Sequence, residues 1–98
     1  MHRDIARIAA YLLQFTTPAS VAGKIAALDR DVAALGDNPH RGSRRDEISP
    51  GLRAIPSAGK GVIAFEINER IRVVRILSIT WGGADWMRRI VQRSELRP

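Results

Sequence analysis

The residues able to perform acid–base or nucleophilic chemistry are few in this chain of 98 residues. It has no cysteine, a single tyrosine (Tyr11) and two histidines, His2 in a terminal segment and His40 in a predicted loop. The acidic residues are scattered, and no spacing is typical of a metal site or of paired carboxylates. Lys60 stands between glycines but lacks the upstream glycine of a phosphate-binding loop. We therefore predict no catalytic residue, no metal and no cofactor.

Positive charge is the stronger signal. The chain carries 16 Lys and Arg residues against 10 Asp and Glu, a formal net charge of +6, and 14 of those 16 cations are arginine. Arginine binds planar anions through paired hydrogen bonds and keeps its charge when it is partly buried. This composition allows two interpretations, an acidic partner (nucleic acid or an acidic protein segment) or a solvated basic surface.

A set of cations falls among the predicted strands: Arg53, Lys60, Arg72 and Arg75. Such side chains can stabilise phosphate charge during RNA cleavage. They can equally bind an acidic partner or face solvent. A nuclease also benefits from a general base or acid, and the second half of the chain contains neither histidine nor tyrosine.

The elements that must position these residues begin with an antiparallel helical hairpin, predicted over residues 4–36. Its first helix, 4–15, has four apolar residues on one face: Ile5, Ile8, Leu12 and Phe15. Thr17 is a good N-cap for the second helix, and Pro18 suits its first position. Apolar residues then recur at spacings of 4, 3, 4 and 3 up to Leu35, and Gly36 is predicted to end the helix.

The second half predicts strands. Residues 37–51 are a loop by composition, rich in Pro, Gly, Ser and charges. A β-meander over 52–80 follows, with strands at 52–57, 61–68 and 70–80. The last strand is apolar on both faces, which predicts an inner strand covered on both sides.

A short helix, 84–93, is predicted to end the chain, with Trp86, Met87, Ile90 and Val91 facing inward. The whole chain, 1–98, is therefore predicted to be a single α+β domain. In that domain the hairpin packs on a small antiparallel sheet of about three strands. No targeting or membrane-spanning segment is visible, so we expect a cytoplasmic protein.

The order of these elements resembles a known family, the ParE branch of the RelE/ParE toxin superfamily of bacterial type II toxin–antitoxin modules. The segments that carry the resemblance are 4–12 (DIARIAAYL), 38–42 (NPHRG), 50–53 (PGLR), 59–67 (GKGVIAFEI), 74–77 (VRIL) and 81–86 (WGGADW). Each is weak alone, and their order and spacing over about nine-tenths of the chain are fairly specific.

The resemblance implies a helical hairpin on a curved antiparallel sheet and a cognate antitoxin that wraps the toxin. It further implies a toxin that inhibits DNA gyrase, with operator DNA bound only through the antitoxin. Alternatives are a ribosome-dependent mRNA endoribonuclease of the RelE type and a non-toxic decayed toxin that only binds antitoxin. A homodimer or a larger toxin–antitoxin assembly is compatible with each.

Under the ParE-like interpretation, the expected antitoxin or target contacts are Arg53, Lys60, Arg72 and Arg75. Trp81, Trp86, Met87 and Ile90 are expected to dock the last helix, or to bind a partner if that helix is displaced. Members of this family usually begin with a strand, and this chain begins at the first helix. We expect the sheet edge left open by that strand to accept an antitoxin strand or a second copy of this chain.

Overall fold

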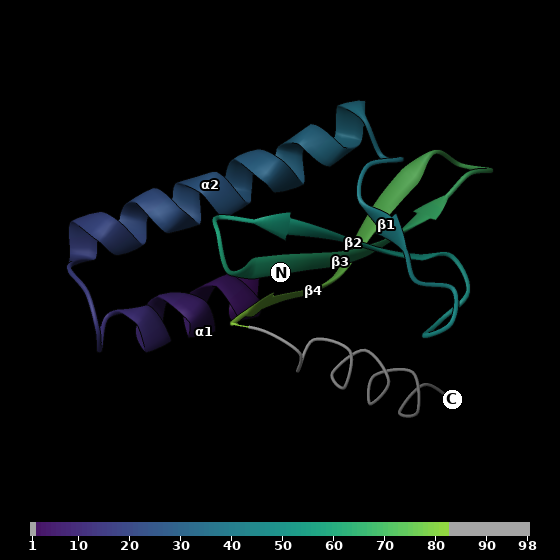
Figure 1. Cartoon of the computed structure of the whole chain (residues 1–98). Helices are drawn as coiled ribbons and strands as arrows, with labels where there is room; N and C mark the ends of the chain where they lie inside the picture. Colours follow the sequence, from purple (N-terminus) through teal and green to yellow (C-terminus); the bar gives the residue numbers. More distant parts are fainter. Residues whose placement is uncertain (1, 83–98) are drawn as a thin grey trace.

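The computed structural model describes residues 2–82, which form an α+β fold of two helices packed against one antiparallel sheet (Figure 1). In chain order the elements are α1 (His2–Leu12), α2 (Pro18–Asp37), β1 (Ser43–Arg44), β2 (Leu52–Ser57), β3 (Gly61–Asn68) and β4 (Val73–Trp81). The predicted helix 84–93 lies outside the described residues. Within 2–82, no helix is long and apolar enough to cross a membrane.

The sheet has four strands in the order β1-β2-β3-β4, one more than predicted. The extra strand, β1, lies inside the segment predicted as loop and pairs Ser43 with Ala54. Gly42 makes this approach possible: its φ is +78°, and a Cβ there would lie 2.3 Å from the Ala54 carbonyl oxygen. A strand of two exposed residues has no alternation, so the sequence pattern could not predict it.

The predicted start of α2 is confirmed. Thr17 Oγ1 accepts a hydrogen bond from the Ser20 N–H at 3.2 Å, and Pro18 is the first helical residue. The predicted end at Gly36 is wrong, because the helix continues to Asp37. The cap is Asn38, whose N–H donates to the Ala34 carbonyl at 3.1 Å.

Helix α1 ends earlier than predicted, at Leu12. The backbone then forms a turn with three-residue spacing, in which the Phe15 N–H donates to the Leu12 carbonyl at 2.9 Å, before the chain continues into α2. Phe15 consequently leaves the helical face that Ile8 and Leu12 share. The prediction that Phe15 faces the core is wrong, since 69% of it is exposed.

The main core lies between the hairpin and one face of the sheet. Leu28 and Leu35 of α2 belong to one buried cluster with Ile63, Phe65 and Ile79 of the strands, and each of the five is at most 1% exposed. A smaller buried cluster contains Leu52, Ala54 and Ala64. Ile63 and Phe65 of β3 thus both face the main core.

Strand β4 is an edge strand among the described residues, so the prediction of an inner strand is wrong. Residues 70–72 belong to the turn that precedes it. Helix α1 packs against β4, and Asp4 Oδ2 accepts a hydrogen bond from the Ile79 N–H at 2.9 Å. Asp4 is only 3% exposed. A carboxylate on the first turn of α1 thus occupies a backbone donor that an edge strand would otherwise present.

Candidate partner-binding site

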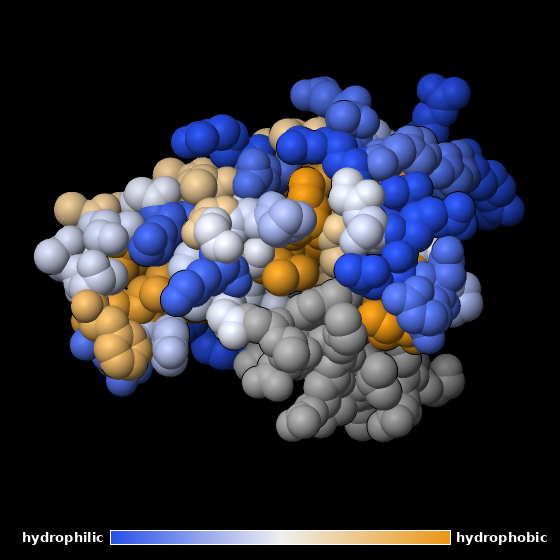
Figure 2. All heavy atoms as spheres, viewed as in Figure 1, coloured by the Kyte–Doolittle hydropathy of each residue, from blue (hydrophilic) through white to orange (hydrophobic). Residues whose placement is uncertain are grey.

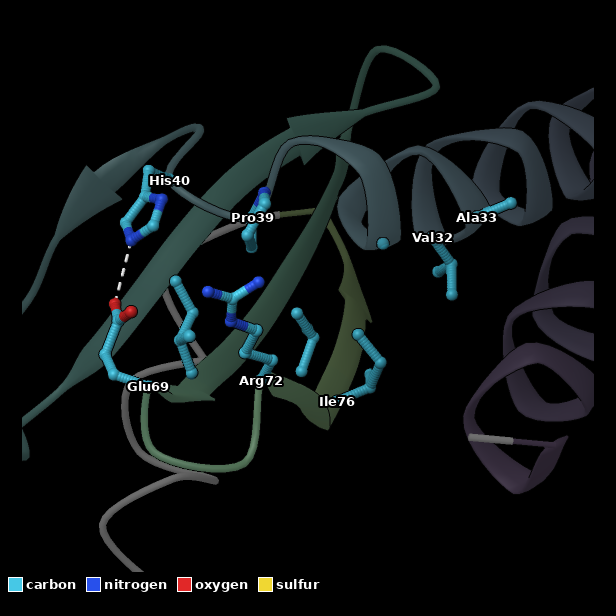
Figure 3. A pocket seen from close by; sticks show the side chains of 10 residues that line it. Val32, Ala33, Pro39, His40, Glu69, Arg72 and Ile76 are labelled. Carbon is cyan, nitrogen blue, oxygen red and sulfur yellow. Dashed lines mark hydrogen bonds and ion pairs between the residues drawn. The ribbon is translucent and has the colours of Figure 1, made fainter.

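A cleft of about 580 Å³ separates the end of α2 from the β3–β4 turn. We call it the His40 cleft. Its apolar wall includes Val32 of α2 and Ile76 of β4, and His40, Glu69 and Arg72 contribute polar side chains (Figure 3). An apolar wall beside a few polar groups is the usual composition of a binding site.

The β3–β4 turn positions Arg72 in this cleft. Asn68 Oδ1 accepts hydrogen bonds from the N–H groups of Arg70 at 3.2 Å and Ile71 at 3.3 Å. Arg72 follows in the left-handed region, with a φ of +55°, which is uncommon for a residue with a side chain. In Figure 3 its guanidinium points into the cleft. The predicted contact residue Arg72 is thus placed where a bound anionic group could reach it.

His40 and Glu69 close one side of the cleft. His40 Nε2 lies 2.8 Å from Glu69 Oε1, and more than half of each side chain is exposed. Arg53 Nη1 donates to the His40 carbonyl at 3.2 Å, so this predicted contact residue holds the loop that carries the histidine. Sequence reasoning missed the pair because 29 residues separate its members. The sequence offered one signal for this pair, because His40 and Glu69 each follow a residue type that is common in turns.

Lys60 and Trp81 line a different cleft, of about 700 Å³, next to the link between α1 and α2. We call it the Trp81 cleft. Gly59, with a φ of +88°, shapes the β2–β3 turn that carries Lys60, and Gly61 pairs with Trp81 across β3 and β4. Lys24 Nζ lies 6.0 Å from the centre of a Trp81 ring, within the range of a cation–π interaction.

Arg75 belongs to neither cleft. It pairs with Glu66 across β3 and β4, and Arg75 Nε lies 3.4 Å from Glu66 Oε1. Because the neighbouring Val74 lines the His40 cleft, alternation along the strand directs Arg75 to the opposite face. The predicted contact residues within the described part of the chain therefore do not form one site, because they lie in two clefts and on the opposite face of the sheet. Trp86, Met87 and Ile90 lie outside the described residues.

Comparison with protein families decides the family of this chain. The family described as "ParE toxin of type II toxin-antitoxin system, parDE" matches residues 2–80. The chain belongs to this family. Comparison with curated proteins gives no significant match.

The match spans α1 to β3 and most of β4 of this ParE-family toxin. It therefore includes the whole lining of the His40 cleft. The α+β fold, with a helical hairpin on an antiparallel sheet, agrees with the family that the sequence resemblance indicated.

Proposed function

We propose that this ParE-family toxin inhibits DNA gyrase and that a cognate antitoxin neutralises it by direct binding. The match of the ParE toxin family to residues 2–80 carries the proposal. The net charge of +6 supports it, because a strongly basic protein attracts an acidic partner segment. The protein acts in the bacterial cytoplasm, where both partners are present.

Lys60, Arg72 and Trp81 are the strongest contacts for these partners. Lys60 and Arg72 are exposed, and each lines a cleft that also has apolar walls. Arg53 supports the His40 loop, and Arg75 is held by a neighbouring glutamate, so both contribute less. Trp86, Met87 and Ile90 remain predicted contacts.

The gyrase proposal is tested with the purified full-length protein in supercoiling and DNA-cleavage assays. We expect supercoiling to stop and cleaved DNA bound to gyrase to accumulate. Arg72→Glu and Lys60→Glu should weaken inhibition, since each reverses a charge in a cleft. Arg30→Glu, an equal change of charge at an exposed position of α2, is the matched control and should inhibit like the unmodified protein. Normal supercoiling at excess toxin contradicts the proposal.

Neutralisation is tested by inducing the protein in bacteria with and without the product of the adjacent open reading frame. Induction alone should arrest growth, and co-expression should restore it. The two products should also elute as one complex in size-exclusion chromatography. Normal growth on induction alone would instead identify a decayed toxin that retains only its binding surface.

Messenger RNA cleavage is a second candidate function, favoured by the contents of the His40 cleft. His40, oriented by Glu69, can accept the proton of a ribose 2′-hydroxyl while Arg72 pairs with the adjacent phosphate. The 2′-oxygen then bonds to phosphorus, the bond from phosphorus to the 5′-oxygen breaks, and that oxygen takes a proton from water. A translating extract should then yield cut messages, and His40→Asn should abolish the cuts without changing the fold. Intact messages during growth arrest exclude this function.

A further inference from the structure

Strands β3 and β4 continue past β2 as a two-stranded ribbon. Strand β2 pairs with β3 only as far as Glu66, whereas β3 and β4 remain paired up to Asn68 and Val73. We call residues 67–74 the β3–β4 ribbon. Its turn lies at one end of the molecule in Figure 1, and Figure 2 shows hydrophilic side chains dominating the surface of that end. Two-stranded ribbons of this kind can enter a groove of duplex DNA.

The tip of the ribbon presents one apolar side chain between two arginines. Ile71 is 58% exposed, and its neighbours Arg70 and Arg72 are also exposed. Asn68 Oδ1 holds the turn in place by accepting hydrogen bonds from the N–H groups of Arg70 and Ile71. Arg72 keeps a left-handed φ of +55° although it has a side chain. Residues in such sparsely populated regions gather at functional sites, which supports a functional role for the tip.

The arginines of the tip are free to bind an anion. Within residues 2–82, neither Arg70 nor Arg72 makes an ion pair. Glu69, the acidic residue of the ribbon, is engaged by His40, whose Nε2 lies 2.8 Å from Glu69 Oε1. Arg41 follows His40 directly and also makes no ion pair in the described part of the chain. The turn and the loop beside it therefore carry an excess of positive charge.

Two arginines that flank one apolar side chain suit the minor groove of duplex DNA. Proteins that bind this groove commonly combine arginine with an apolar wedge, such as isoleucine, that inserts between base steps. The minor groove of B-DNA is about 6 Å wide, and phosphates line both of its edges. The minor groove of duplex RNA is wide and shallow, so it would hold such a tip poorly. An acidic peptide could neutralise the arginines, but it has no groove to receive Ile71.

We propose that the tip of the β3–β4 ribbon binds duplex DNA. Ile71 enters the minor groove, Arg70 pairs with a phosphate on one edge, and Arg72, on the side of the His40 cleft, pairs with a phosphate on the other. These contacts depend on the backbone and on groove shape, so they select no operator sequence. The inference goes beyond the proposed inhibition of gyrase, because this binding needs neither gyrase nor antitoxin. Each proposal can therefore fail while the other holds.

The test measures binding of the full-length protein to a short fluorescein-labelled DNA duplex, rich in A·T pairs, by fluorescence anisotropy. We expect saturable binding with a Kd on the order of 10⁻⁵ M at about 0.1 M salt. Duplex RNA of the same sequence and a polyglutamate peptide of matched charge should each bind about fivefold more weakly or less. Netropsin, which occupies the minor groove, should displace the protein, and methyl green, which occupies the major groove, should not.

Variants locate the bound DNA. Arg70→Gln should weaken binding about fivefold and lower the slope of log Kd against log salt by about 1, because one phosphate contact is lost. Arg30→Gln removes an equal charge at an exposed position of α2 and should change the affinity less than about twofold. Ile71→Ser should weaken binding about threefold and leave the salt slope unchanged. Its matched control is Leu13→Ser, because Leu13 is 49% exposed in the link between the helices, and this variant should bind like the unmodified protein.

Absence of DNA binding at about tenfold the expected Kd would overturn the proposal. Equal affinity for the RNA duplex or the peptide would also overturn it, because the tip would then recognise negative charge alone. Failure of netropsin to displace the protein would exclude the minor groove. Equal losses in Arg70→Gln and Arg30→Gln, or in Ile71→Ser and Leu13→Ser, would place the bound DNA elsewhere on the molecule and contradict the proposal.

Discussion

At the scale of single residues, Asp4 has an effect out of proportion to its size. It is buried on the first turn of α1, and its carboxylate accepts the Ile79 N–H at the edge of the sheet. Its other oxygen lies 3.7 Å from Arg7 Nη1. Sequence patterns assign an acidic residue in a first turn to the helix dipole, so burial against a strand 75 residues away could not be predicted from them.

We predict that Asp4→Ala lowers the free energy of unfolding by about 2 kcal/mol, because it leaves a buried backbone donor without its acceptor. Asp4→Asn should lose less, since the amide oxygen can still accept. Urea unfolding followed by circular dichroism measures both. Asp29→Ala, an exposed position of α2, is the control and should change stability by no more than about 0.5 kcal/mol.

Two glycines provide a second prediction at this scale. Gly23→Ala should stabilise the protein by roughly 0.5–1 kcal/mol, since Gly23 is helical and an added Cβ meets nothing within 4 Å. Gly42→Ala should destabilise it by more than about 1–2 kcal/mol, because left-handed φ alone costs that much and the methyl group would also collide with the Ala54 carbonyl. Equal effects in thermal unfolding would contradict the structural distinction between these glycines.

At the scale of elements, the sequence pattern correctly predicted features that follow a local signal, and it missed features that have no such signal. It gave the bounds of β2 and β3 and the start of α2, because alternation and capping are local properties of the chain. It missed β1, the early end of α1 and the edge position of β4. Those depend on which segments meet in space, and Phe15 leaving its helical face is one example.

The N-cap of α2, which the sequence predicted, should also contribute to the free energy of unfolding. Thr17→Ala should lower the free energy of unfolding by about 1 kcal/mol through loss of the hydrogen bond to Ser20. Thr16→Ala, one residue earlier, removes a similar hydroxyl without touching the cap and should have a smaller effect. Chemical denaturation of both variants under one condition measures the difference, and a larger loss in Thr16→Ala would contradict the assignment.

At the scale of the whole molecule, positive charge and apolar surface lie together in the Trp81 cleft, which Lys60, Tyr11 and Phe15 also line. Composition alone allowed either an acidic partner or a solvated basic surface, because it cannot say whether cations and exposed apolar groups share a place. The structure puts Lys60 and Trp81 at one end and His40, Glu69 and Arg72 at another. Each of the two clefts is formed by chain segments that are far apart in the sequence. The sequence alone therefore could not predict which residues share a cleft.

This arrangement predicts how partner binding responds to salt. Raising sodium chloride from about 0.05 M to about 0.5 M should weaken binding of an acidic partner, mainly through a slower association rate, because screening shortens the reach of the basic surface. Stopped-flow fluorescence with an acidic peptide measures this rate. An association rate independent of salt would show that the net charge of +6 takes no part in recognition.

The bond between Asp4 and Ile79 also bears on how the protein is made. A ribosome releases α1 first and β4 much later, so the nascent chain holds a helix whose strand partner does not yet exist. Helices α1 and α2 can pair early, but the first helix cannot dock on β4 until that strand has left the ribosome. Any toxic activity that depends on the assembled sheet therefore begins only after β4 has been synthesised.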